Sequence, residues 1–113
     1  MNDRPFHWGI ASSAPQTEGA AFEDGRGASI WDEFSRKRGR IAGNHTPAVC
    51  TAFYHHYHED LDLIQALGIP NFRTSIAWPR IFPHGNGHAH PKGIDFYDRL
   101  TDACLARGIT PWY

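Results

Sequence analysis

One arginine lies in a stretch whose alternation is typical of a strand. In residues 71–78, NFRTSIAW, large side chains alternate with smaller ones, and Arg73 is placed among them. A guanidinium keeps its charge, so an arginine buried in such a strand needs an acidic partner. One hypothesis is a structural ion pair with Glu18 or Asp60. The other is a functional arginine whose carboxylate lies outside this chain, and the residues alone favour neither.

A histidine-rich stretch raises the question of a metal site. In residues 55–60, HHYHED, His55 and His58 are three residues apart and can share a helix face beside Glu59. The order HExxH is missing and no further ligand is obvious, so we expect a solvated helix face and no metal. We also expect exposed positions for the histidines of the glycine-rich loop that follows, His84, His88 and His90.

Two segments have the spacing of helices. Apolar side chains recur every three or four residues over 53–67 and over 94–106. A glycine follows each segment, Gly68 and Gly108, and an apolar stretch comes next. This order predicts a left-handed helix cap and then entry into a strand.

Strands are expected at residues 8–11, 71–77 and 109–113. Because helices separate them, the strands should form a parallel sheet. The long connection after the first strand contains one further helical signal. Ser29 can cap a short helix there, with Asp32 at the third position as in a capping box.

Composition limits the class of protein. The chain has 113 residues, of which 41% are hydrophobic and 20% charged, as in one modest globular domain. The net charge of −1 gives no indication of a nucleic-acid or membrane partner. The start, MNDRPFHWG, lacks the apolar core of a signal peptide, and the two cysteines lack CxxC spacing, so we expect a cytoplasmic protein. Four tryptophans are expected in the core: Trp8, Trp31, Trp78 and Trp112.

Five blocks of the sequence resemble, in order, the opening of glycoside hydrolase family 1, the family of retaining β-glucosidases and their 6-phospho relatives. The blocks span residues 6–112 and are FHWGIASSAPQTEGA, DGRGASIWDEFS, YHHYHEDLDLIQALGI, FRTSIAWPRIFPHG and GIDFYDRLTDACLARGITPW. The resemblance implies an α/β fold, namely the first two strand–helix units and the start of the third strand of an incomplete (β/α)8 TIM barrel. Residues 1–113 would be a single partial domain, the N-terminal segment of such an enzyme.

The resemblance carries two site residues onto this chain. Gln16 matches the glutamine that hydrogen-bonds hydroxyls of the non-reducing sugar, and Arg73 matches the arginine that holds the catalytic nucleophile ionised. The substrate would be a β-glucoside or a related sugar, bound without cofactor or metal. The family's two catalytic glutamates lie in Asn-Glu-Pro and Thr-Glu-Asn-Gly motifs that this sequence does not contain. The isolated chain is therefore expected to be inactive, and Glu18 is expected to be a buried structural carboxylate.

The sequence departs from the family pattern at Pro15 and at Ala52, where the family has an Asp. Glucoside and 6-phosphoglucoside substrates stay open, because the phosphate-reading residues belong to a C-terminal loop of the family. Two other hypotheses also fit: a stand-alone sugar-binding or interaction module, and one subunit of a split barrel. For the isolated part of a barrel, two unpaired sheet edges and a broad apolar face predict marginal stability or self-association.

Overall fold

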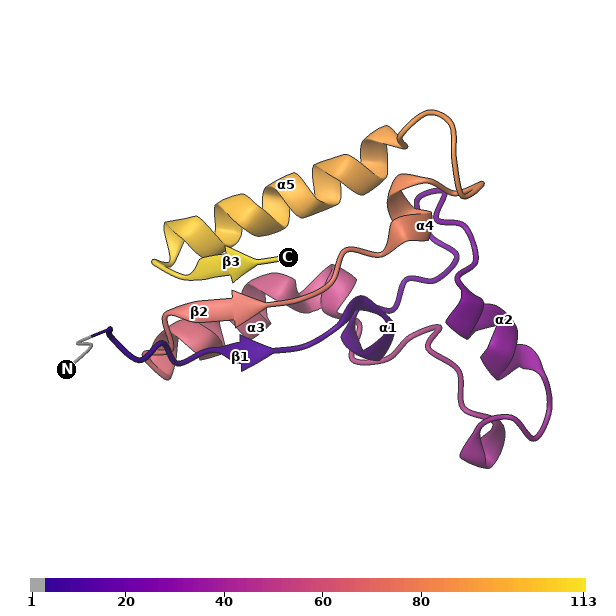
Figure 1. Cartoon of the computed structure of the whole chain (residues 1–113), viewed down its shortest axis with the longest axis horizontal. Helices are drawn as coiled ribbons and strands as arrows, with labels where there is room; N and C mark the ends of the chain where they lie inside the picture. Colours follow the sequence, from indigo (N-terminus) through magenta and orange to yellow (C-terminus); the bar gives the residue numbers. More distant parts are fainter. Residues whose placement is uncertain (1–3) are drawn as a thin grey trace.

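The computed structural model describes residues 4–113, which form a small parallel sheet with long helices packed on one face (Figure 1). The strands are hydrogen-bonded in chain order and all run in the same direction, as predicted. They are β1 (Ile10–Ala11), β2 (Asn71–Arg73) and β3 (Thr110–Trp112), preceded in the last two cases by the long helices α3 (Phe53–Ala66) and α5 (Pro91–Ala106). None of the helices in residues 4–113 has the length and apolar character needed to cross a membrane.

Short helical elements gather beyond the ends to which the strand arrows point (Figure 1). They are α1 (Ala14–Thr17), α2 (Ile30–Arg36), the 3-10 turn η1 (Ala42–Asn44) and α4 (Trp78–Ile81). Only α2 was expected from the sequence, and its capping box is confirmed. The Asp32 backbone N–H donates to Ser29 Oγ at 3.2 Å, and the Ser29 backbone N–H donates to Asp32 Oδ2 at 2.7 Å.

The strands are shorter than predicted. β2 ends at Arg73 and not at residue 77, and residues 74–77 form an irregular connection to α4. The Ala77 N–H accordingly donates to the Tyr97 hydroxyl at 2.7 Å and not to a strand. The predicted C-terminal ends of α3 and α5 are confirmed to within one residue, with Gly68 and Gly108 in the left-handed region at φ 69° and 70°. α5 begins at Pro91, three residues before the predicted start.

One departure from the family pattern has a visible consequence at the start of α3. Ala52 is the N-cap residue, lies in the left-handed region at φ 53°, and makes no side-chain cap hydrogen bond. An aspartate at this position could accept a hydrogen bond from the first turn of the helix. The entry to α3 therefore depends on its tertiary packing and not on a cap.

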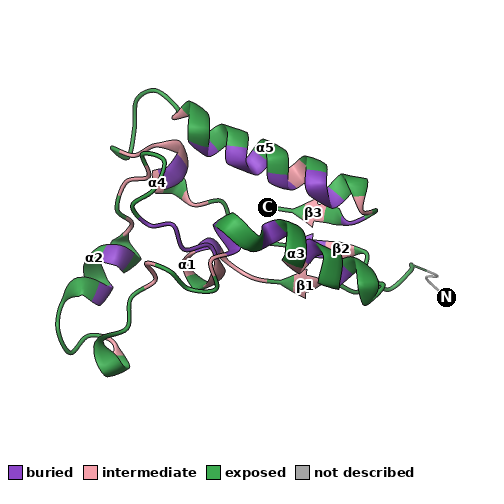
Figure 2. Ribbon diagram, turned by 180° about the vertical axis from the view of Figure 1, so that it is seen from behind, coloured by how far each residue is buried: buried purple, intermediate pink, exposed green. Residues whose placement is uncertain are grey.

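The sheet has one covered face and one open face. Phe72 in β2 is buried and packs on Phe53 of α3, with ring centroids 5.7 Å apart. The neighbouring row across the sheet consists of Ala11, Arg73 and Trp112, which are paired in register and all exposed. The buried surfaces of α3 and α5 lie toward the covered face (Figure 2).

The expectation that the tryptophans form the core is wrong. The core is filled by smaller aromatic and aliphatic side chains, mostly from α3 and α5. All four tryptophans are at least half exposed, at 70%, 51%, 60% and 56% for Trp8, Trp31, Trp78 and Trp112. They lie near strand ends, on the open face or on short helices, where the described residues cover them only in part.

The open sheet predicts that the isolated chain associates in solution. Within residues 4–113, β1 and β3 each have one unpaired edge, and Ile76 beyond β2 is 44% exposed. A lysine near such a surface opposes association. We expect the mass from light scattering to rise with concentration, and to rise less for Ile76→Lys. A monomeric mass at every concentration, together with one cooperative melting transition, would contradict this prediction.

The cap of α2 should be lost in acid. Burial alone would raise the pKa of Asp32, but hydrogen bonds from Ser29 and from Arg26 Nη1, the latter at 2.9 Å, outweigh it and leave that pKa below its ordinary value. A lowered folded-state pKa stabilises the fold above the unfolded-state value, and this stabilisation disappears as the pH falls through the folded-state pKa. We expect the amides of α2 to lose hydrogen-exchange protection below pH about 4. Asp32→Asn should show low protection at pH 7 and little further change in acid, and an unchanged acid profile in this variant would count against the assignment.

Candidate functional site

Gln16 lies on α1, immediately past the end of β1. Its backbone N–H donates to Ser13 O at 3.0 Å, which fixes the main chain of the short helix. Its side chain is exposed, and among residues 4–113 it has no hydrogen-bond partner. The amide can therefore offer two donors and one acceptor to a ligand.

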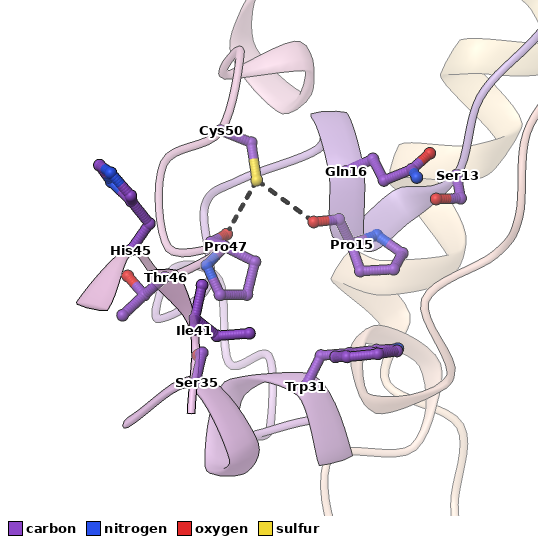
Figure 3. Close-up of a pocket in the computed structure, with 10 residues that line it drawn as sticks. All are labelled: Ser13, Pro15, Gln16, Trp31, Ser35, Ile41, His45, Thr46, Pro47 and Cys50. Atoms are coloured by element: carbon purple, nitrogen blue, oxygen red, sulfur yellow. Dashed lines mark hydrogen bonds between the residues drawn. The ribbon is translucent and has the colours of Figure 1, made fainter. Parts of the chain in front are cut away.

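A cavity of about 470 Å³ lies beside Gln16 (Figure 3). Residues from α1, α2 and the segment before α3 line it: Ser13, Pro15, Gln16, Trp31, Ser35, Ile41, His45, Thr46, Pro47 and Cys50. Trp31 and Pro15 supply flat apolar surface, while Gln16 and Ser13 supply polar groups on the same side. Such a mixture of an aromatic face and a few polar groups suits a small polar ligand with apolar patches, such as a sugar.

The thiol in this cavity is placed to donate a hydrogen bond to the surrounding backbone. Cys50 Sγ lies 3.2 Å from Pro47 O and 3.3 Å from Pro15 O, so the S–H can donate to either carbonyl (Figure 3). Burial raises the pKa of the Cys50 thiol above its ordinary value. Because the reactive form is the thiolate, Cys50 serves here as a neutral hydrogen-bonding group of the wall.

Arg73 is exposed, contrary to the sequence-based expectation of burial. It belongs to the row that faces the open side of the sheet, and its Nη1 donates to Ser12 O at 2.9 Å. None of the ion pairs found among the described residues includes it, so the structural pair with Glu18 or Asp60 is not formed. A partner outside these residues remains the prediction for Arg73.

Gln16 and Arg73 lie at the same end of the sheet, since Gln16 follows β1 and Arg73 is the last residue of β2. Arg73 does not line the cavity. Their link is the backbone of Ser12, which accepts from Arg73 four residues before Gln16.

Arg80 is almost fully buried, and no prediction from the sequence named it. Its Nε donates to Glu18 Oε1, and the two side chains are 1% and 6% exposed. The second oxygen, Glu18 Oε2, accepts from the Tyr97 hydroxyl at 2.8 Å. The prediction that Glu18 is a buried structural carboxylate is confirmed. The available signal was an arginine within the apolar run WPRIFP, residues 78–83.

The histidines of HHYHED lie on a solvated helix face, as expected. His55 contacts Glu23 at 2.8 Å, His56 contacts Glu59 at 3.3 Å, and His58 is exposed. His84 and His88 are exposed as well. His90 differs from expectation, because it is half-buried with its Nε2 at 2.7 Å from Asp24 O. Residues 4–113 contain no group of three potential metal ligands.

The lining of the cavity includes one histidine, His45, but no carboxylate. Both oxygens of Glu18 are occupied by Arg80 and Tyr97. Retaining glycoside hydrolysis requires two carboxylates about 5 Å apart, one as nucleophile and one as acid and base.

Comparison with known proteins gives the family. The sequence profile of Glycosyl hydrolase family 1 matches residues 3–113. Beta-glucosidase A of Acetivibrio thermocellus is 51% identical over 108 residues, which are 96% of this chain and 24% of that protein. Thermostable beta-glucosidase B of Thermobispora bispora is 50% identical over 95% of this chain and 22% of its own length.

The likeness extends to three dimensions. The solved family 1 β-glucosidase of Thermotoga maritima superposes with a TM-score of 0.92 at 42% sequence identity, covering 96% of this chain and 26% of that one. The present chain thus spans about a quarter of the length of the relatives that it matches. It belongs to glycosyl hydrolase family 1.

Proposed function

We propose that this chain is the N-terminal part of a retaining β-glucosidase, in which it contributes part of the sugar-binding pocket and no catalytic glutamate. The observation that carries the proposal is the close superposition on a β-glucosidase structure, with 42% identity along 96% of the chain. Residues 1–113 would then be one partial domain. Its three strands would be the first three of a (β/α)8 barrel, whose sites lie at the C-terminal strand ends.

The position of Gln16 supports a role in sugar binding. The unpartnered amide lies past the C-terminal end of β1, where barrel enzymes place their binding groups. One amide can donate to one hydroxyl and accept from its neighbour, which suits two adjacent hydroxyls of a pyranose. The Thermotoga maritima relative has been solved in complex with glucoimidazole and with deoxynojirimycin. A β-glucoside is accordingly the substrate class that we assign.

The exposure of Arg73 supports a role beside the nucleophile. A guanidinium on the open face of β2, bonded only to a backbone carbonyl, is available to a carboxylate from another part of the barrel. Such a pair lowers the pKa of the carboxylate, which must be ionised in order to attack the anomeric carbon. Arg73 is thus the positioning cation and not the reacting group.

A hybrid enzyme tests the proposed function. In Beta-glucosidase A of Acetivibrio thermocellus, the segment that matches this chain would be replaced by residues 1–113. We expect the hybrid to hydrolyse p-nitrophenyl β-D-glucoside. A hybrid that folds with a cooperative melt and is inactive, while the parent enzyme is active, would overturn the proposal.

Gln16→Ala in the hybrid should weaken sugar recognition. Loss of two hydrogen bonds to hydroxyls should lower kcat/KM by about 10- to 100-fold, since each bond contributes about 1 kcal/mol. The matched control is Gln65→Ala, because Gln65 lies on α3 and donates to Arg107 O at 3.2 Å, away from the cavity. Equal effects of the two substitutions would remove Gln16 from the binding site.

Arg73→Met should alter the pH profile of the hybrid. Without the guanidinium the nucleophile's pKa should rise, so the acidic limb of kcat/KM should move to higher pH by about one unit or more. Arg38→Met is the control, because Arg38 is exposed after α2 and forms no ion pair among the described residues. A uniform fall in rate with an unmoved acidic limb would show that Arg73 does not act on the nucleophile.

A further inference from the structure

A buried polar cluster lies directly behind the helix that carries Gln16. It consists of Glu18, Arg80 and Tyr97, which come from the end of α1, from α4 and from α5. We propose that these three residues are positioning residues for sugar binding, holding Gln16 in the orientation in which it meets the substrate. The proposal rests on the proposed function, because it assigns a supporting structure to that same binding site.

The helix α1 cannot hold its own shape. It has four residues, and isolated helices of even three turns are marginal in water. Its first N–H, that of Ala14, donates to Ser75 Oγ at 2.9 Å, which anchors the N-terminal end to the segment after β2. The anchor at the other end is Glu18, the C-cap residue, whose carbonyl accepts from the Tyr54 N–H at 2.9 Å.

Both oxygens of the Glu18 side chain are fixed. Oε1 accepts from Arg80 Nε, and Oε2 accepts from Tyr97 Oη at 2.8 Å. Arg80 Nη2 also donates to the carbonyls of the next two residues, Gly19 at 3.2 Å and Ala20 at 3.5 Å. The cluster thus fixes the side chain of Glu18 and also the backbone of Gly19 and Ala20.

The groups that grip Glu18 are themselves immobilised by packing. Arg80 is 1% exposed, and its Cζ lies 4.3 Å from the centre of the Tyr54 ring. Its Nη1 is buried without a hydrogen-bond partner among the described residues, so the whole guanidinium is enclosed by protein. A Cβ built on Gly93 would lie 2.0 Å from Arg80 O, which shows that the backbones of α5 and α4 touch.

Tyr97 links the cluster to Ala77, the N-cap residue of α4. Its hydroxyl donates to Glu18 and accepts from the Ala77 N–H at 2.7 Å, and burial, followed by the charge of Glu18, raises the pKa of this phenol. The hydroxyl therefore stays protonated and remains a donor. Since Gln16 and Glu18 are two residues apart on one turn, about 3 Å along its axis, a shift of Glu18 moves Gln16 with it.

A double-mutant cycle in the hybrid enzyme tests the proposal. Tyr97→Phe removes one bond to Glu18 and keeps the ring, so we expect kcat/KM for p-nitrophenyl β-D-glucoside to fall by about tenfold, the equivalent of one buried hydrogen bond. In a Gln16→Ala background, Tyr97→Phe should lower kcat/KM by less than about twofold, because a group that acts through Gln16 then has nothing left to position. Rates are normalised to the folded fraction from circular dichroism.

The matched control is Tyr54→Phe. It removes another tyrosine hydroxyl, which donates to Asp24 Oδ2 at 2.6 Å and not to Glu18. It keeps the ring that packs on Arg80 and the backbone N–H that donates to Glu18 O. We expect it to change kcat/KM by less than about twofold in either background. Should Tyr97→Phe fail to fold, the same cycle with Arg80→Lys replaces it, since this variant keeps the positive charge beside Glu18 and removes the hydrogen bonds from Nη2 to the carbonyls of the next two residues.

The outcomes separate the two proposals. If Tyr97→Phe lowers kcat/KM equally with Gln16 and with Gln16→Ala, or lowers it in neither background, the positioning role is overturned and the proposed function is left intact. A folded but inactive hybrid, or a Gln16→Ala variant with full activity, overturns the proposed function and with it the positioning role.

Discussion

The pairing of Arg80 with Glu18 is the constraint on which the arrangement of this chain depends. Both side chains are buried, and the charge of an arginine cannot be removed by deprotonation. Removal of either partner would leave an uncompensated charge at a cost of about 3 to 5 kcal/mol. That cost is comparable with the whole stability of a small domain, about 5 to 15 kcal/mol. The pair therefore permits only one arrangement of the three elements that carry the cluster, namely the end of α1, α4 and the face of α5 that contains Tyr97.

The two faces of the sheet differ in whether their charged side chains have partners. Phe72 and the aromatic side chains of α3 and α5 close the covered face. The charged side chains buried on that side, Arg80 and Glu18, are paired with each other. The open face presents Arg73 and Trp112 with no acidic partner among the described residues. Two arginines seven residues apart thus have opposite roles: Arg80 completes a closed structure, and Arg73 is available to a group that approaches the open face.

Much of this arrangement follows from local sequence patterns. Helical periodicity and a glycine at the left-handed cap gave the ends of α3 and α5, and the Ser29–Asp32 spacing gave α2. These patterns involve interactions between residues close in sequence, so they can be recognised without knowledge of the fold. The order of strands and helices also gave the parallel sheet, because crossovers permit few alternatives.

The inferences that failed, on Arg73 and on the four tryptophans, required knowledge of which side of an element is covered. The alternation in NFRTSIAW indicates two faces but cannot say which one is buried, so Arg73 was placed inside and Arg80 was overlooked. The tryptophans failed for the same reason, since hydrophobicity predicts burial only where a neighbouring element exists to provide it. The positions of Gln16 and Arg73 at one end of the sheet could be inferred, but their geometry depends on α1 and α4, whose four-residue lengths leave no periodic signal.

A buried ion pair is an expensive way to fix a short helix, and an apolar cluster of the same volume is often at least as stable. The ion pair differs from an apolar cluster because its hydrogen bonds depend on direction. Apolar contacts tolerate sliding and rotation, whereas Glu18 meets two donors at fixed angles, and Arg80 contacts two further carbonyls of the same turn. A turn that only closed the fold would gain little from such definition. A turn that presents an unpartnered amide to a ligand gains much, because misplacement of a binding group by about 1 Å is enough to lose its contribution.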